Sequence, residues 1–233
     1  MKLKVYGLLL IFCFGGVSVV FGGQLTNISV TPNDNSAGAA AIYTISFTTS
    51  VIGNGVTVGI PADGKIMIGF PSGFDLTNAE LAQSTDPAVL NGGLVVSVSN
   101  DTLTIERDNT GSAVGGNITV GVKVAVILNH QTAASTYALD IETRATDNSV
   151  IDSGTSSTFT ITHDELASFQ FNPISQQTAG NSFNATITAV DEFGNQVDNF
   201  SGTASVSDLS GTISPTSINF ISGQWTGYQS NFK

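Results

Sequence analysis

The residues best suited to binding a cation lie in one short segment of the chain. Asp191, Asn195 and Asp198 offer carboxylate and amide oxygens close together in sequence, and calcium is held by such oxygens together with backbone carbonyls. The alternative is an ordinary strand connection, because Asp and Asn hydrogen-bond to the backbone in turns and Gly194 supplies a positive φ. The spacing of an EF-hand loop is absent. We therefore expect no cofactor, and calcium at these three residues is the alternative.

Three pairs of carboxylates have the residue types that glycoside hydrolysis uses. They are Glu106 with Asp108, Asp140 with Glu142, and Asp191 with Glu192. Residues two apart on a strand face the same side, but the first pair flanks Arg107 near a hairpin end and the second brackets Ile141 on a face that we expect to be solvated. No aromatic-lined cleft accompanies any pair. The sequence therefore predicts no catalysis by these carboxylates.

Nucleophilic and metal-assisted catalysis are not predicted either. The segment after residue 23 has no cysteine, its histidines are His130 and His163, and neither a Gly-x-Ser-x-Gly nor a His-Glu-x-x-His motif occurs. Both histidines are expected in loops. Trp225 lies in an alternating strand, where we expect core packing rather than a sugar-stacking platform. We expect this chain not to be an enzyme.

Short alternating strands must position all of these residues. From Gln24 onward the sequence is rich in Thr, Ser, Val, Ile, Gly and Asn and shows no long apolar repeat of 3.6 residues. The strands predicted for the first module are 25–30, 40–50, 65–70, 94–99, 102–107, 117–128, 137–146 and 158–162. Segment 75–90 is the one place where a helical turn fits, and we expect a crossover loop there. Two packed antiparallel sheets are the predicted outcome.

The clearest local signal is a hairpin over residues 94–107. With a two-residue turn at Asn100 and Asp101, Val98 faces Leu103 and Val96 faces Ile105. The intervening pairs join Ser99 to Thr102 and Ser97 to Thr104. One face is apolar and the other carries hydroxyls, which is typical of a half-buried antiparallel hairpin.

A second module begins after a boundary near residues 163–165. Its predicted strands are 167–171, 182–190, 202–207, 217–221 and 224–230. The predicted organisation is a secretory signal at 1–23, a β-sandwich at 24–163 and an immunoglobulin-like sandwich at 164–233. Because a complete module of this class takes about 100 residues, we expect the second sandwich to be truncated at its C-terminus, with an open sheet edge that accepts a donated strand.

The first 23 residues have the order of a secretory signal. Lys2 and Lys4 precede an apolar run over 5–21, and Gly22 and Gly23 follow. Val20 and Gly22 suit cleavage after Gly22, so that the mature chain begins at Gly23 or Gln24. An uncleaved membrane anchor is the alternative, because the run approaches the roughly 18 residues that span a bilayer. The single cysteine, Cys13, lies in this segment, so the exported part has no disulfide.

The charge of the chain excludes one class of partner. Its formal net charge is −11 at pH 7, and phosphate binding requires clustered Lys and Arg that the sequence lacks. We expect no nucleic-acid partner. The acidity favours solubility and opposes self-association.

Four runs of the second module form a pattern: AGNSF at 179–183, TAVDEFGN at 188–195, FSGT at 200–203 and FISGQWTG at 220–227. This pattern resembles the bacterial immunoglobulin-like domains of invasin- and intimin-type surface proteins. Through KIMIGFPSGF at 65–74, the first module is similar, more weakly, to sandwich repeats of prokaryotic surface-layer-like proteins. The resemblance implies a bacterial, extracellular or cell-surface protein.

These observations predict a non-catalytic, exported structural or adhesive protein, as the N-terminal part of a longer tandem-repeat protein. Its expected partners are a cell-surface protein or a polysaccharide, downstream modules of the same chain, and a strand donor at the open edge. The alternative is an accessory spacer or carbohydrate-binding region of a secreted polysaccharide-degrading enzyme whose catalytic domain lies downstream. Reading the gene beyond Lys233 distinguishes the two.

Overall fold

The computed structural model describes residues 22–51, 59–178, 181–209, 211 and 213–229. Every helix or strand in this described part is a β-strand, which confirms the all-β prediction. No helix there is long and apolar enough to cross a lipid bilayer. The predicted secretory signal at 1–23 lies outside the described residues except for Gly22 and Gly23.

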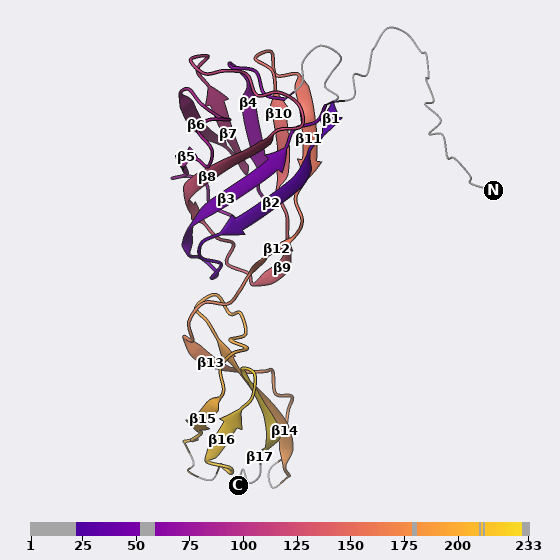
Figure 1. The fold of residues 1–233 in the computed structure, drawn as a ribbon. Coiled ribbons are helices and arrows are strands. Elements are labelled where there is room, and N and C mark those ends of the chain that lie inside the picture. The colour runs from indigo at the N-terminus through magenta and orange to yellow at the C-terminus, as the bar shows by residue number, and fades with distance from the viewer. Residues whose placement is uncertain (1–21, 52–58, 179–180, 210, 212, 230–233) are drawn as a thin grey trace, which may run out of the picture.

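The first sandwich is built from two large sheets (Figure 1). The larger sheet has the order β1-β11-β10-β4-β7-β6, with bounds Gly23–Gln24, Val150–Thr155, Asp140–Arg144, Lys65–Gly69, Thr102–Arg107 and Leu94–Ser99. The facing sheet has the order β2-β3-β8-β5, with bounds Thr26–Pro32, Ala40–Thr48, Thr119–Leu128 and Glu80–Ser84. A small pair joins β12 (Phe159–Ile161) to β9 (Ala134–Tyr137).

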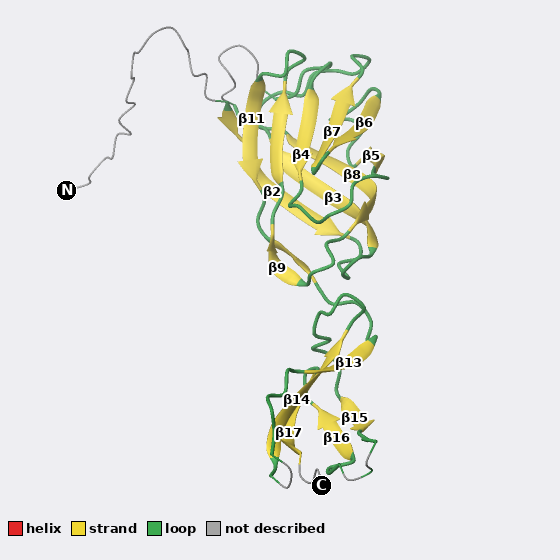
Figure 2. Ribbon diagram, turned by 180° about the vertical axis from the view of Figure 1, so that it is seen from behind, coloured by secondary structure: helices red, strands yellow, loops and turns green. Residues whose placement is uncertain are grey.

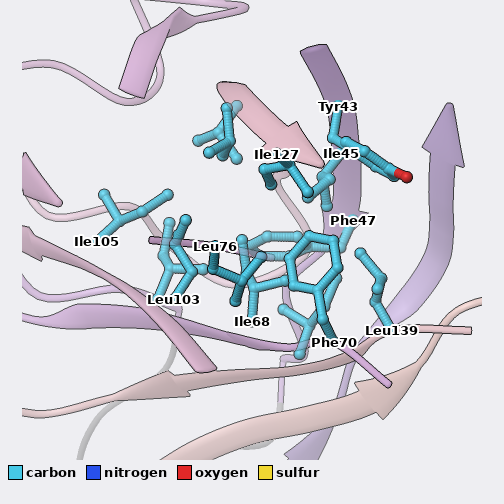
Figure 3. Packing of buried hydrophobic residues seen from close by; sticks show 14 of the residues in the cluster. Tyr43, Ile45, Phe47, Ile68, Phe70, Leu76, Leu103, Ile105, Ile127 and Leu139 are labelled. Carbon is cyan, nitrogen blue, oxygen red and sulfur yellow. The ribbon is translucent and has the colours of Figure 1, made fainter. Parts of the chain in front are cut away.

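Strand alternation builds the core between these two sheets. On β3, Tyr43, Ile45 and Phe47 point inward and are fully buried, and on β4 Ile66 and Ile68 do the same. Figure 3 shows side chains from both sheets interlocking in one apolar cluster. Burying each such side chain stabilises the fold by about 1.5 to 3 kcal/mol, so this cluster is a main source of the stability of the sandwich.

The predicted hairpin is confirmed in its register. Strands β6 and β7 pair Val98 with Leu103 and Val96 with Ile105, and the serine and threonine pairs also match. Asn100 takes a φ of 51° in the turn, a left-handed conformation that Asn tolerates better than most residues. Leu103 and Ile105 are fully buried.

Segment 75–90 corrects one expectation. We predicted a loop with a fitting helical turn, but the segment contains strand β5, which pairs with β8 along the sheet edge. The sequence of β5 does not show this, because the hydrogen bonds come from a strand about 40 residues later in the chain, and such tertiary pairing overrides local preference. Leu76 and Leu90, on either side of β5, are buried in the core.

Two further differences concern the last third of the first sandwich. The single strand predicted over 137–146 is two strands, because β9 ends at Tyr137 and pairs with β12, whereas β10 begins at Asp140 and pairs with β4 and β11. Strand β11 itself was not predicted. Its sequence, VIDSGT, contains an Asp, a Ser and a Gly, which are residue types typical of loops. The Asp of this run, Asp152, is nevertheless buried.

The second sandwich has two smaller sheets. One has the order β13-β14-β17, with bounds Ser168–Phe171, Phe183–Val190 and Gln224–Gln229, and the other pairs β15 (Gly202–Ser205) with β16 (Ser217–Phe220). On β14, Ala185, Ile187 and Ala189 face inward and are buried, as alternation along the strand requires. Completion of this sandwich by further strands stays a prediction.

The two sandwiches lie end to end, and each has its own apolar cluster (Figures 1 and 2). Strand β1 lies at the far end of the first sandwich, and β17 belongs to the second. The chain passes between them through residues 162–167, next to the segment that contains the calcium candidates.

Candidate functional site between the sandwiches

The junction loop, residues 191–198, follows β14 and is organised around the Asp191 carboxylate. Asp191 is 2% exposed. Its Oδ1 accepts hydrogen bonds from the backbone N of Phe193 at 3.0 Å and of Asn195 at 2.8 Å. Its Oδ2 accepts from the backbone N of Asp164 at 2.9 Å and from Nδ2 of Asn195 at 2.8 Å. Both oxygens are therefore occupied by two donors each.

These bonds determine the charge state of Asp191. Burial by itself would raise the pKa of Asp191, but the hydrogen bonds from Asp164, Asn195 and Phe193 together outweigh burial and hold that pKa below its usual value. Gly194, with a φ of 87°, closes the turn by donating its N–H to the carbonyl of Asp191. The hydrogen bonds of the Asp191 carboxylate are those expected of an Asp that caps a turn. They favour the interpretation of this segment as a strand connection.

Asn195 connects the junction loop to the first sandwich. Its Oδ1 accepts a hydrogen bond from the backbone N of Ala133, and its Nδ2 donates to the carbonyl of Gln131, both at 2.8 Å. Because Nδ2 also donates to Asp191, one side chain links the carboxylate of the second sandwich to two backbone groups of the first.

The segment that receives Asn195 is itself held in place. Asn129, at the end of β8, is 2% exposed, and its Oδ1 accepts a hydrogen bond from the buried Tyr43 hydroxyl at 2.5 Å. Its Nδ2 donates to the carbonyls of Asp34 and Ser36 at 2.9 and 2.8 Å. Burial raises the pKa of Tyr43, so its hydroxyl stays a donor. Segment 131–133, which contacts Asn195, therefore follows closely after a residue that three hydrogen bonds attach to the first sandwich.

Phe193 adds an apolar contact to this junction. Its ring packs against the core cluster of the first sandwich and covers Gly38. A Cβ atom at Gly38 would lie 2.3 Å from the ring, and the φ of Gly38 is 68°. Glycine is thus required at position 38 by the close approach of Phe193 as well as by backbone conformation.

Asp198, the third calcium candidate, interacts elsewhere. Its Oδ1 lies 3.2 Å from Nε2 of His163, whose Nδ1 is 2.7 Å from the carbonyl of Asp164. Both ring nitrogens of His163 therefore lie next to oxygen atoms. The structure therefore brings Asp191 and Asn195 together but directs Asp198 to His163. Within the described residues, no group of three or more His, Cys, Asp or Glu side chains is placed to hold a metal ion.

The other sequence candidates are dispersed. Glu106 lies 3.4 Å from Lys65, and Glu142 pairs with Arg144. Asp108 accepts hydrogen bonds from Gly93 and Thr110, and Asp140 accepts one from Thr155. Glu192 is exposed. Four of these carboxylates therefore have cationic or hydrogen-bonding partners of their own.

His130 and Trp225 are placed in packing contacts. The His130 ring lies against Phe74 and Tyr137, with centroids 5.8 and 5.1 Å away, and its Nδ1 accepts a hydrogen bond from Thr132. Trp225 is half-buried and packs against the apolar cluster of the second sandwich. Both rings therefore contribute to packing.

Sequence reasoning missed a buried cation at the end of the first sandwich away from the junction. Arg107 is 3% exposed. Its Nη1 donates to the carbonyls of Ile60 and Pro61 at 3.1 and 2.7 Å, and its Nη2 donates to those of Asn91 and Ser112 at 3.2 and 2.6 Å. One guanidinium thus joins three loops. The signal was present, because alternation from Leu103 and Ile105 places residue 107 on the core face.

Comparison with known proteins gives distant structural likenesses. No protein-family model and no curated protein matches this chain. A cohesin module from a Clostridium perfringens family 33 glycoside hydrolase aligns at 14% identity over 61% of this chain and 98% of the module, with a TM-score of 0.36.

Two surface proteins align over more of the chain. The major pilin subunit of Bacillus cereus aligns at 9% identity over 90% of this chain and 57% of the pilin, with a TM-score of 0.34. The Actinomyces fimbrial adhesin FimA aligns at 11% identity over 88% of this chain and 78% of the adhesin, with a TM-score of 0.31. These likenesses assign no family, and the resemblance to invasin- and intimin-type domains stays a prediction.

Proposed function

We propose that this chain is a non-catalytic spacer or adhesive segment of an exported surface protein, in which two sandwiches keep a fixed end-to-end orientation. The observation that carries the proposal is the junction, where Asn195 bonds to two backbone groups of the first sandwich and Phe193 packs against its core. A spacer that presents a binding surface away from a cell requires such a fixed junction, since linked domains otherwise move freely.

The size of the effect follows from the contacts. Two hydrogen bonds between the sandwiches contribute about 0.5 to 1.5 kcal/mol each, and partial burial of a phenylalanine ring adds about 1 to 2 kcal/mol. The sum, about 2 to 5 kcal/mol, favours the docked arrangement over an undocked one by at least about 30-fold, at about 1.4 kcal/mol per factor of ten.

Small-angle X-ray scattering tests the fixed junction. We expect the wild-type scattering curve to fit the extended arrangement of Figure 1, and the double substitution of Asn195→Ala and Phe193→Ala to broaden the distance distribution. Glu192→Ala is the matched control, because this side chain lies in the same loop but is exposed. Identical curves for the wild type and the double variant would refute a junction held by these contacts.

Surface location and adhesion need a separate experiment. Protease treatment of intact cells that express the full gene is expected to release peptides of this chain, and the purified protein is then tested against cells and polysaccharides. Binding to neither leaves the spacer role and excludes adhesion by this segment. Hydrolysis of a polysaccharide by the purified chain would contradict the proposal.

A further inference from the structure

Asp152 is a buried carboxylate with an incomplete set of hydrogen bonds. It is fully buried on β11, beside Thr143 of β10, whose Oγ1 accepts a hydrogen bond from the Asp152 backbone N at 3.1 Å. Its Oδ2 accepts one from the backbone N of Ser50 at 3.2 Å, but its Oδ1 has no hydrogen-bond partner in the described structure. Buried carboxylates normally have a cationic or multiple hydrogen-bonding partner, so a donor is missing here.

The neighbouring strand brings the start of the described chain to this carboxylate. Strand β1 lies beside β11 (Figure 1). The two strands pair in parallel, and Gly23 is opposite Asp152 in their register. Residues opposite one another share a face of the sheet, and Gly23 is buried like Asp152. Because paired strands run about 4.8 Å apart, the Gly23 backbone lies in the strand next to Asp152, on the level of its side chain.

The direction of the backbone selects one nitrogen. Leu25 donates its N–H to the carbonyl of Ser153 on β11 at 2.9 Å. Successive N–H groups of a strand point to opposite sides, so the nitrogen of Gly23 also points toward β11, whereas those of Gly22 and Gln24 point away. The single N–H of an uncut Gly23 is therefore directed at the β11 backbone within the sheet plane, whereas the Asp152 side chain stands out of that plane. The additional hydrogens of an ammonium at position 23 are the ones free to turn toward this carboxylate.

Gly22, the residue before Gly23, also allows β1 to lie close to β11. A Cβ atom at Gly22 would lie 2.7 Å from the carbonyl oxygen of Ile151, so a side chain there would push β1 off β11. In the sequence, Val20 and Gly22 suit a signal-peptidase site after Gly22. The close strand contact and the small-residue pattern thus coincide at the same peptide bond.

We propose that cleavage after Gly22 creates an α-ammonium group on Gly23 that pairs with the buried Asp152 carboxylate, so that export processing completes the first sandwich. In this hydrolysis by a signal peptidase, water adds its hydroxyl to the Gly22 carbonyl carbon and its remaining hydrogen to the Gly23 nitrogen, and the Gly22–Gly23 bond breaks. The Gly22 carboxyl loses a proton, and the Gly23 amine gains one. The uncut nitrogen has one N–H, whereas the ammonium has three. This inference rests on the proposed export of the chain.

The pairing reverses the expected effect of one substitution. Burial raises the pKa of Asp152 and a hydrogen bond from Ser50 offsets this only in part, so burial disfavours the ionised carboxylate when no cation pairs with it. In a chain with its first nitrogen elsewhere, Asp152→Asn therefore leaves the melting temperature unchanged or raises it. In a chain that begins at Gly23, the same substitution removes the partner of a buried ammonium and therefore lowers the melting temperature.

Three chains that begin at Gly22, Gly23 and Gln24, each with Asp152 and with Asp152→Asn, test the inference by thermal unfolding. We expect the Gly23 chain to melt about 5 to 10 °C above the other two, and Asp152→Asn to abolish the difference. The chains that begin at Gly22 and Gln24 are matched controls, since they differ from it by one residue. Equal melting of all three, or a difference that persists in Asp152→Asn, would overturn the inference.

Mass spectrometry of the exported protein provides the second measurement. A mature chain that begins at Gly23 supports the inference. A surface-exposed protein that begins at any other residue overturns it and leaves the proposed function intact, whereas a protein that stays inside the cell contradicts the proposed export itself.

Discussion

Replacing Arg107 by methionine should destabilise the first sandwich, because the guanidinium is the donor for four loop carbonyls. Methionine keeps the apolar stem of the side chain and removes only the donors. The carbonyls of Ile60 and Pro61 also accept backbone hydrogen bonds, from Val114 and Gly64 respectively. Those of Asn91 and Ser112 have no second donor among the described residues.

The magnitude follows from those two carbonyls. Both hydrogen bonds are partly buried, so water can reach the freed carbonyls, and each lost bond costs about 0.5 to 1.5 kcal/mol. Arg107→Met should therefore lower the free energy of unfolding by about 1 to 3 kcal/mol. At about 2 to 4 °C per kcal/mol for a chain of this size, the melting temperature falls by about 2 to 12 °C. Differential scanning calorimetry of the whole chain measures this directly.

Lys65→Met is the matched control for the loss of a positive charge. Lys65 lies at the same end of the sandwich and pairs with the exposed Glu106, and such surface pairs contribute about 0 to 1 kcal/mol. If Arg107→Met destabilises no more than Lys65→Met, the guanidinium is not organising these loops and the reasoning is refuted.

Three further predictions concern the junction. Gly38→Ala should lower the melting temperature more than Gly194→Ala, since both glycines have positive φ but only Gly38 is covered by Phe193, and a Cβ at Gly194 meets nothing within 4 Å; equal losses would contradict the contact. Calcium or a chelator should shift the melting temperature by less than about 1 °C, because Asp191 already accepts four hydrogen bonds; a clear rise with calcium would reinstate the metal site. The pKa of Asp191 is lowered in the fold, so the stability that its ionised carboxylate contributes is complete above the usual aspartate pKa of about 3.9 and is lost as the pH falls through the folded pKa. The difference in melting temperature between the wild type and Asp191→Asn should therefore narrow below about pH 4. A difference that stays constant would refute this.

Several parts of the fold could be predicted because the information is local. The hairpin of β6 and β7 needs only alternating apolar residues and an Asn that tolerates positive φ, and its register followed from these. The inward residues of β14 likewise follow from a period of two. Strand β5 could not be predicted, since its pairing partner β8 is remote in sequence.

The candidate site was predicted in part. Asp191 and Asn195 were found as oxygen-bearing neighbours, but their partners lie on segments 131–133 and 164, which the sequence does not connect to them. The aromatic residue in the otherwise polar run DEFGN was a usable signal, because an exposed loop gains nothing from a phenylalanine unless another surface covers it.

The amino-acid sequence by itself determined the all-β character, the inward and outward faces of the strands and the acidic surface, because each depends on residue type and a short period. Only the tertiary structure decided that Asn195 joins two sandwiches, that Asp198 meets His163 rather than Asp191, and that Gly23 lies beside Asp152. These contacts unite residues separated by about 30 to 130 positions, and their geometry exists only after the sheets have paired and the core has closed.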